Sequence, residues 1–190
     1  LSRNTTLTLS RDAAGGNGLS FAPTTFYDGQ GVMVPVASGI KNLKDLAGKP
    51  ICVESGTTTE LNLADRMREI NAPYTPLKFQ TGDQTYAAYL QGRCVAVTSD
   101  RSQLAAKRTA FPSPAAHTLL PEVLSKEPLT PATVNGDPAW ADAVRWTIYA
   151  LMQAEELGIN QANVAAKVAE AKANPNLADR RRFFGIEGDF

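Results

Sequence analysis

The chain has 190 residues, its 19 lysines and arginines balance 19 aspartates and glutamates, and 43% of its residues are hydrophobic. This length fits one ordinary domain or two small ones, with enough apolar residues to build a core. Zero net charge excludes the strong positive field of a nonspecific nucleic-acid-binding protein, and any general attraction to anionic membranes. One histidine and two cysteines are too few for a closed Cys/His zinc site, so we expect no metal site of that kind.

Residues 1–10 predict a strand, because Leu7 and Leu9 alternate with threonine and serine. A strand at the start of a chain normally has earlier partners in sequence, and neither an initiator methionine nor an apolar leader precedes it. We therefore expect a removed signal peptide and a chain that is incomplete at both ends. The alternative is a mature protein that begins in a strand. The arginines at 180–182 are interpreted as a solvated helix face.

Short apolar segments in the middle of the chain alternate with helical patterns. Strands are predicted at residues 32–34, 50–53, 74–79 and 94–98. Helices are predicted over 61–70, where apolar residues recur at helical spacing, and over 83–91 and 101–108. Strands and helices therefore alternate between about residues 50 and 108, which indicates a parallel α/β sheet.

Other elements flank this central unit. A turn is predicted at 15–18, a single helical turn at 42–48, and extended segments at 117–120 and 124–129. Helices are predicted at residues 138–158, 160–172 and from about 175. Asp137 and Pro138 suit the start of the first of these helices, and Trp140 and Trp146 on it are interpreted as core or inter-lobe packing. An arrangement in which strands and helices flank a central unit is what two lobes joined by crossing strands would produce.

The strongest local signal is the turn at 54–60, which follows a buried strand and opens a helix. Its sequence, Glu-Ser-Gly-Thr-Thr-Thr-Glu, places hydroxyls and backbone N–H groups at a helix N-terminus, where a carboxylate or phosphate is favoured. The turn lacks the Gly-Lys-Ser/Thr ending of a phosphate-binding P-loop, and Glu60 would repel phosphate. From this turn alone, an ordinary capped helix is the simpler interpretation.

Two charged residues follow predicted strands. Arg11 comes after a strand that carries Asn4 and Thr6, and its guanidinium forms a bidentate fork for a carboxylate. The alternative for Arg11 is a solvated side chain. Asp100 follows a strand of the parallel unit, and ligands collect at the carboxyl ends of such strands. Its carboxylate would either pair with an ammonium group or cap the next helix.

Catalytic interpretations find little support. The lone histidine, His117, stands in an extended segment without a serine or cysteine nucleophile motif beside it, and we interpret it as structural.

Cys52 and Cys94 each begin a predicted strand of the same α/β unit. A disulfide formed in an oxidising compartment is the preferred interpretation, and two buried thiols are the alternative.

Seven segments give the chain a resemblance to a known family. They are residues 3–12, 26–31, 52–65, 92–94, 120–122, 125–129 and 154–158. By these segments the chain resembles the polar amino-acid-binding proteins of bacterial ABC importers, extracellular solute-binding proteins of family 3. The likeness is greatest to the general L-amino-acid-binding branch of that family.

The resemblance implies an α/β, periplasmic-binding-protein-like fold of two lobes joined by crossing strands. Lobe one would be partial at residues 1–33, lobe two complete at 34–124, and a mainly helical return to lobe one would occupy 125–190. The implied function is capture of an L-amino acid between the lobes, followed by hinge closure and delivery to an inner-membrane ABC permease. The resemblance thus implies a monomeric periplasmic protein that is not an enzyme, uses no cofactor and binds no nucleic acid.

In this family, lobe one contributes an arginine that clamps the ligand α-carboxylate, and the resemblance assigns that role to Arg11. The serine or threonine contact of lobe one falls on Thr6, with Asn4 nearby. These positions agree with the carboxylate chemistry expected of an arginine that follows a polar strand.

Lobe two contributes the rest of the implied site. Its ligand-binding turn corresponds to Thr57, Thr58 and Thr59, with Glu54 at the start of the turn. The carboxylate that receives the ligand α-ammonium corresponds to Asp100. A zwitterion needs a cationic fork, helix N-terminal donors and one opposed anion, and the separate sites together provide those charges.

The sequence departs from the family pattern at Leu7, Val95 and Thr130, and it lacks a counterpart of the lobe-one aromatic residue that covers the ligand. Three alternatives stay open. One is an enzyme on the same fold, of the arogenate or cyclohexadienyl dehydratase type, for which Glu54 is the candidate general acid. Another is the ligand-binding module of a receptor, and the third is a fragment that folds without binding.

Overall fold

The computed structural model describes residues 1–13 and 18–188, so most of the turn predicted at 15–18 lies outside the described residues. The chain divides into two compact units. Unit 1 comprises Leu1–Thr25 and Thr130–Phe190, and unit 2 comprises Phe26–Leu129. The lobe boundaries expected from the sequence, after residues 33 and 124, stay a prediction.

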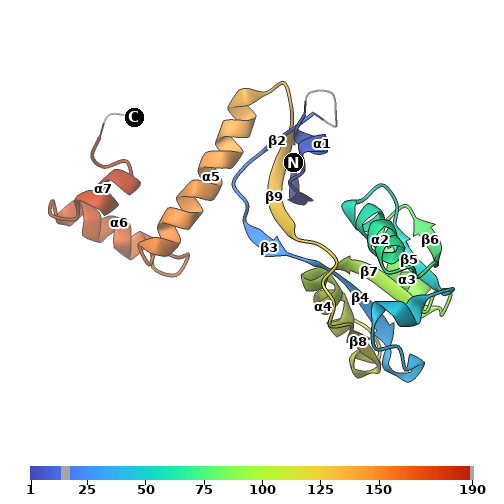
Figure 1. Ribbon diagram of the computed structural model, residues 1–190. Coiled ribbons are helices and arrows are strands. Elements are labelled where there is room, and N and C mark those ends of the chain that lie inside the picture. The colour runs from blue at the N-terminus through green and yellow to red at the C-terminus, as the bar shows by residue number, and fades with distance from the viewer. Residues whose placement is uncertain (14–17, 189–190) are drawn as a thin grey trace. The chain divides into compact units, whose positions relative to one another are not determined.

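Unit 2 is built on a five-stranded mixed sheet with the order β6-β5-β7-β4-β8 (Figure 1). Its strands are β4 (Gln30–Pro35), β5 (Pro50–Glu54), β6 (Thr75–Phe79), β7 (Ala96–Asp100) and β8 (His117–Leu119). β5 pairs in parallel with both β6 and β7, which confirms the parallel unit predicted from the strand–helix alternation. β4 pairs antiparallel with both β7 and β8, and these antiparallel pairs make the sheet mixed.

The helices of unit 2 are α2 (Thr58–Glu69), α3 (Gly82–Leu90) and α4 (Arg101–Thr109), with the short turns η1 (Val36–Ser38), η2 (Leu43–Leu46) and η3 (Pro114–Ala116). They cover the sheet through two apolar clusters. Ile51 packs with Leu63 and Met67 of α2, whereas its neighbour Cys52 packs with Tyr89 of α3. Because successive side chains of a strand point to opposite faces, the two clusters lie on the two sides of the sheet.

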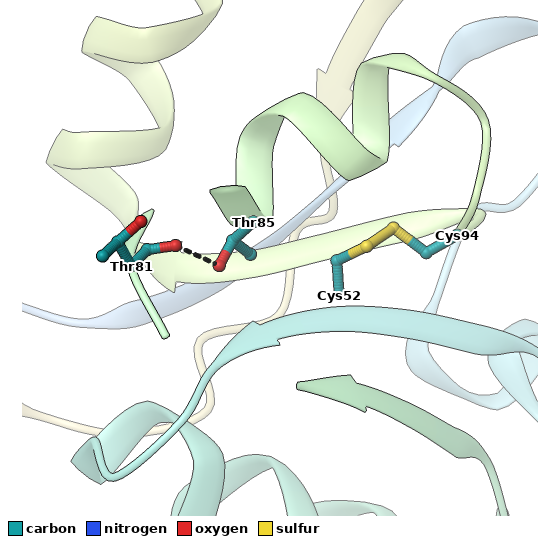
Figure 2. Close-up of a disulfide and its surroundings, with 4 residues drawn as sticks. All are labelled: Cys52, Thr81, Thr85 and Cys94. Carbon is teal, nitrogen blue, oxygen red and sulfur yellow. Dashed lines mark hydrogen bonds between the residues drawn. A yellow bond between two sulfur atoms is a disulfide. The ribbon is translucent and has the colours of Figure 1, made fainter. Parts of the chain in front are cut away.

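A disulfide joins Cys52 of β5 to Cys94, which lies between α3 and β7, with the Cα atoms 5.7 Å apart (Figure 2). The predicted pairing is thus confirmed, and both cysteines are buried in the cluster that includes α3. At the start of the same helix, Thr85 Oγ1 donates a hydrogen bond to Thr81 O at 2.9 Å, and this bond ties the side chain to the helix backbone (Figure 2). The disulfide therefore fastens the loop that follows α3 to β5.

His117 has a packing role, as predicted. Its Nδ1 lies 2.7 Å from the Tyr89 hydroxyl, and its ring lies 5.1 Å from the Phe111 ring, edge to face. Burial, together with the nearby Arg108 charge, lowers the pKa of His117 below its usual value. A neutral imidazole in these contacts explains why the single histidine belongs to the aromatic packing of unit 2.

Unit 1 contains β1 (Ser2–Thr6), α1 (Leu9–Asp12), β2 (Leu19–Phe21), α5 (Pro138–Glu156), α6 (Val164–Ala173) and α7 (Ala178–Phe183). Within this unit, β2 pairs antiparallel with the final part of β9 (Glu127–Val134). The first part of β9 pairs antiparallel with β3 (Phe26–Asp28) inside unit 2. Over the described residues, no helix combines the length and apolarity needed to span a membrane.

The strand predicted over residues 1–10 ends at Thr6, and that prediction was too long. The backbone N–H groups of Asp12 and Ala13 bond to the carbonyls of Thr8 and Leu9, closing one helical turn. Leu9 is 82% exposed, so the alternating apolar pattern has no buried face to hold it in a strand.

The helix predicted from residue 138 is confirmed as α5, with the Asp137 side chain accepting a hydrogen bond from Trp140 N at 2.9 Å. No residue of α5 is buried, and Trp146 is 66% exposed. The structure therefore buries neither Trp146 nor the half-exposed Trp140 in a core, contrary to one interpretation of the sequence.

Candidate functional site

The candidate site in unit 2 lies at the sheet edge where β5, β6 and β7 end. These parallel strands are followed directly by the N-termini of α2, α3 and α4 (Figure 1). Because β4 is antiparallel to β7, its first residue, Gln30, lies opposite Asp100 at the same edge. The edge therefore gathers helix N-termini, which favour anions, around carboxylates and buried amides.

The turn between β5 and α2 is shaped by its own side chains. Thr57 is the N-cap of α2: its hydroxyl accepts from Glu60 N at 3.2 Å and donates to Glu54 O at 2.8 Å. Gly56 has φ +73°, a left-handed conformation that suits glycine and redirects the chain into the helix. The capped-helix interpretation is thus confirmed. A ligand at this turn would bind to backbone N–H groups of the first helical turn other than the one that Thr57 caps.

Glu60 stabilises the turn, and its negative charge is paired rather than free to repel an anion. Its carboxylate accepts from Gly56 N at 2.8 Å and pairs with Lys78 Nζ at 2.6 Å. The hydrogen bond from Lys78, followed by the one from Gly56, holds the pKa of Glu60 below its usual value. The lysine thus offsets the negative charge that the sequence alone suggested would repel a phosphate.

Glu54 ends β5 at the start of the turn and is half-buried. A Cβ built on Gly82 would lie 3.3 Å from Glu54 Oε2, so the carboxylate lies against the first residue of α3. A larger residue at position 82 would displace this carboxylate, because a separation this short requires the neighbour to move. The glycine therefore makes room for Glu54 between the starts of two helices.

Asp100 ends β7 and occupies the N-cap position of α4, but its side chain makes no capping hydrogen bond. Asp28 takes that role instead: its Oδ2 accepts from Ser102 N at 3.2 Å and also from the Ser102 hydroxyl. Burial, together with the charges of Asp28 and Glu127, raises the pKa of Asp100 to about 6. The helix-cap alternative for Asp100 is therefore wrong, and its carboxylate sits in a negative field that a cation would relieve.

Two buried polar residues at this edge carried no assigned role from the sequence. Gln30 is fully buried, and its Nε2 donates to Thr59 O and Thr98 Oγ1, each at 2.9 Å. Glu127 is 2% exposed and accepts from Asn62 Nδ2 at 2.8 Å. Each is a polar residue at the start of a mostly buried strand, which is the sequence signal that could have identified them.

The predicted residues of unit 1 form a second group. Arg11 Nη1 donates to the backbone carbonyl of Thr6 at 2.9 Å, so the guanidinium of α1 lies beside the end of β1. Thr6 is buried and Asn4, two positions earlier on β1, is exposed. Within the part of the chain that the structure describes, no cluster of three or more His, Cys, Asp or Glu side chains is placed to hold a metal ion.

The structure thus brings Glu54, the threonines 57–59 and Asp100 to one sheet edge of unit 2, and it brings Arg11 to Thr6 in unit 1. It adds Gln30 between Thr59 and Asp100, since the amide bonds to one and its strand position faces the other. Their roles in ligand binding stay predictions.

Comparison with known proteins finds relatives over the full chain. The chain is 50% identical over 189 residues to the general L-amino acid-binding periplasmic protein AapJ of Rhizobium johnstonii, a match covering 100% of the chain and 53% of AapJ. It is 44% identical over 189 residues to the glutamate/glutamine/aspartate/asparagine-binding protein BztA of Rhodobacter capsulatus, covering 100% of the chain and 54% of BztA. The chain thus spans about half the length of these curated relatives. No protein-family model matches it.

A solved structure agrees with these relatives. An ABC transporter periplasmic binding protein from Brucella ovis, with glutathione bound, is 46% identical and superposes with a TM-score of 0.86. The match covers 98% of this chain and 57% of the Brucella chain. The α/β fold of a periplasmic binding protein, expected from the resemblance, is thereby confirmed for the part of the fold that this chain spans.

Proposed function

We propose that the chain is part of a periplasmic amino-acid-binding protein of an ABC transporter, like the relatives that it matches, and that it supplies much of the binding site for an L-amino acid. In this proposal the whole protein is a monomer that acts in the periplasm and delivers its ligand to an inner-membrane ABC permease. Residues 34–124 would be lobe two, and residues 1–33 and 125–190 would belong to lobe one. A hinge between the lobes would close over the ligand.

The observation that carries the proposal is that a helix N-terminus and a carboxylate that caps no helix lie at the same edge of the sheet. Backbone N–H groups at Thr58 and Thr59 open α2 and favour the ligand carboxylate. Asp100, whose capping role has passed to Asp28, favours the ligand ammonium. An α-amino acid carries both charges on one carbon, so one ligand satisfies both groups.

Arg11 completes the proposed carboxylate site from unit 1. Its bond to Thr6 O uses one of the five N–H donors of the guanidinium, and the fork geometry suits a carboxylate. Asn4 and Thr6 are proposed to contribute the neighbouring polar contacts. The proposal requires the two groups of residues to face the same ligand when the whole protein closes.

The ligand class is proposed to be broad and polar. Glu54, at the start of the turn, is placed to accept hydrogen bonds from the side chain of the ligand. BztA is named for glutamate, glutamine, aspartate and asparagine, and the Brucella protein was solved with glutathione. The γ-glutamyl end of glutathione carries a free α-ammonium and α-carboxylate, so it presents the same two charges as a free amino acid. Glutathione is therefore the second candidate ligand.

The enzyme alternative receives no support from the relatives, because they are named as binding proteins. The proposal that the protein acts in the periplasm rests on relatives that are named as periplasmic. We therefore propose capture without chemistry, in which specificity depends on charge placement rather than on a reactive group.

Isothermal titration calorimetry with a panel of L-amino acids and glutathione tests the proposal, on the chain and in the context of its complete reading frame. We expect Asp100→Asn and Arg11→Ala each to weaken binding by at least about 30-fold, because each removes a charged partner worth about 2 kcal/mol or more. Asp65→Asn and Arg145→Ala, which alter exposed ion pairs, are the matched controls and should bind as the parent does. Parent-like binding by both site variants would refute the assignment.

A further inference from the structure

The chain passes between its two units twice, after Thr25 and after Leu129. A buried polar side chain lies just inside unit 2 at each of these passages, Gln30 at the first and Glu127 at the second. Buried glutamine and glutamate are uncommon because their desolvation must be offset by hydrogen bonds. The partners of these two residues therefore indicate what their burial achieves.

Gln30 bonds to the backbone of the turn at the start of α2. Its Nε2 donates to Thr59 O at 2.9 Å and to Thr98 Oγ1 at 2.9 Å, and Thr98 Oγ1 donates onward to Gly31 O at 2.7 Å. The amide orientation is fixed chemically, because the Thr59 carbonyl can only accept. Gln30 thus connects the first strand of the sheet to the helix turn that contains Thr59.

Glu127 bonds to side chains of the same helix. It accepts from Asn62 Nδ2 at 2.8 Å and, with a longer contact of 3.4 Å, from Thr58 Oγ1. Glu127 opens β9, whereas Thr58 and Asn62 lie in the first part of α2. The second passage of the chain is thus fastened to the same helix as the first.

The two passages also contact one another. Asp28 and Glu127 are opposite residues in the β3–β9 pair. Ser125 donates to Glu127, and its hydroxyl accepts from Gln30 N at 3.4 Å. A Cβ on Gly29 would lie 2.9 Å from Ser125 O, so glycine is needed for this approach. The contacts join both passages and the start of α2 into one hydrogen-bonded network inside unit 2.

We infer that Gln30 and Glu127 are positioning residues, which hold the first turn of α2 in register with the two segments through which the chain passes between its units. This inference rests on the proposed function, because the same turn is the proposed carboxylate site. Neither residue needs to touch the ligand. A ligand that binds the turn would therefore act on the hydrogen bonds of the network and, through them, on both connecting segments.

The inference explains why polar residues occupy these buried positions. Apolar residues of similar size would fill the space, and replacing both partners of a buried hydrogen bond by apolar groups is often nearly neutral for stability. A hydrogen bond, unlike an apolar contact, fixes the direction and register of the groups that it joins. The network therefore serves the placement of the turn more than the stability of the core.

The test compares Asn62→Ala and Gln30→Met with Thr81→Ala. The first two remove bonds of the network without introducing a charge, and Thr81→Ala removes the N-cap of α3 elsewhere in unit 2. In Asn62→Ala and Gln30→Met, we expect backbone amides of residues 60–63 to exchange with solvent about three- to tenfold faster by NMR. Thr81→Ala should speed exchange in α3 alone.

A double variant provides the rescue. In Asn62→Asp with Glu127→Gln, the donor and acceptor exchange places, so the Gln side chain donates to the Asp carboxylate at unchanged net charge. We expect this variant to recover parent-like exchange at residues 60–63. Unchanged exchange in Asn62→Ala and Gln30→Met, or no recovery in the double variant, would overturn the inference whether or not a ligand binds.

Affinity separates the inference from the function on which it rests. If the parent binds an amino acid, Asn62→Ala and Gln30→Met should weaken binding about three- to tenfold, and the double variant should restore it. Parent-like affinity in both single variants would overturn the positioning role while leaving the proposed function intact. Failure of the parent to bind any ligand of the panel would refute the proposed function, and the exchange data would still decide the role of the network.

Discussion

The two units of the chain differ in how much of their own apolar surface they bury. In unit 2, two buried clusters cover both faces of the sheet and a disulfide crosses one of them. In unit 1, α5 buries none of its residues, and a hollow of about 280 Å³ opens between this helix, Leu1 and Pro131. The difference shows that unit 2 contains the partners of its own elements, whereas unit 1 presents apolar surface of the kind found at contact sites.

This contrast bears on function because the proposed site draws on both units. Asp100 and the threonine turn stand on a packed sheet, which places donors and carboxylates reproducibly. Arg11 stands on a one-turn helix with no buried residue. We therefore expect the ammonium end of the site to be fixed in this chain and the carboxylate clamp to depend more on its surroundings.

The largest expected effect is loss of the disulfide. Replacing Cys52 and Cys94 by alanine, or reducing the parent with a thiol, should lower the free energy of unfolding of unit 2 by about 4 kcal/mol, since the bridge closes a long loop. Both tryptophans lie in unit 1, so tryptophan fluorescence follows unit 1, and tyrosine near-UV circular dichroism follows mainly unit 2. An equal loss in both signals would contradict the contrast between the units.

A core substitution should have the next largest effect. Leu104 is fully buried in unit 2, and Leu104→Ala should cost about 3 kcal/mol in denaturant unfolding through lost burial and a residual cavity. Leu151 on α5 is 62% exposed, and Leu151→Ala should cost less than about 0.5 kcal/mol. Similar costs at the two positions would show that α5 is packed in solution.

A smaller effect follows from Asp100. Its pKa is raised to about 6, so between about pH 4 and pH 6 the folded state binds more protons than the unfolded state, and stability falls as pH rises. Above pH 6 the ionised carboxylate stays destabilising, and Asp100→Asn should stabilise unit 2 there by about 1 kcal/mol after allowance for solvent screening. The gain should vanish near pH 4. A gain that is independent of pH would indicate that Asp100 ionises normally.

The sequence was most informative where local pattern and burial agree. Cys52 and its neighbours alternate between two buried faces, so the strand and its parallel partners could be predicted. Leu7 and Leu9 alternate in the same way without a buried face, and the predicted strand was too long. Trp146 lies on α5, a helix that the sequence predicted, yet it is 66% exposed, a fact that periodicity alone cannot reveal.

The candidate site was predictable for residues that sit at strand ends or in a distinctive turn, such as Asp100 and Thr57. Gln30 and Glu127 were not assigned, because their partners lie far away in sequence: Thr59 is 29 residues from Gln30, and Asn62 is 65 residues from Glu127. The transfer of the α4 cap from Asp100 to Asp28 is equally nonlocal, since it depends on the antiparallel β4–β7 pair, in which Gln30 lies opposite Asp100. Such contacts require the fold before they can be recognised.

The most direct test of the account is the pH dependence of amino-acid binding, measured by calorimetry in buffers of different ionisation enthalpy. If Asp100 receives the ligand ammonium, affinity should be constant above pH 6 and fall by up to about tenfold for each pH unit below it, because protonation removes the attracting charge. Binding at pH 6 should also release about half a proton per ligand, because half of the Asp100 carboxyls are protonated at that pH, and Asp100→Asn should abolish both effects. Binding whose strength is the same at pH 5 and pH 7 and releases no proton would contradict the account.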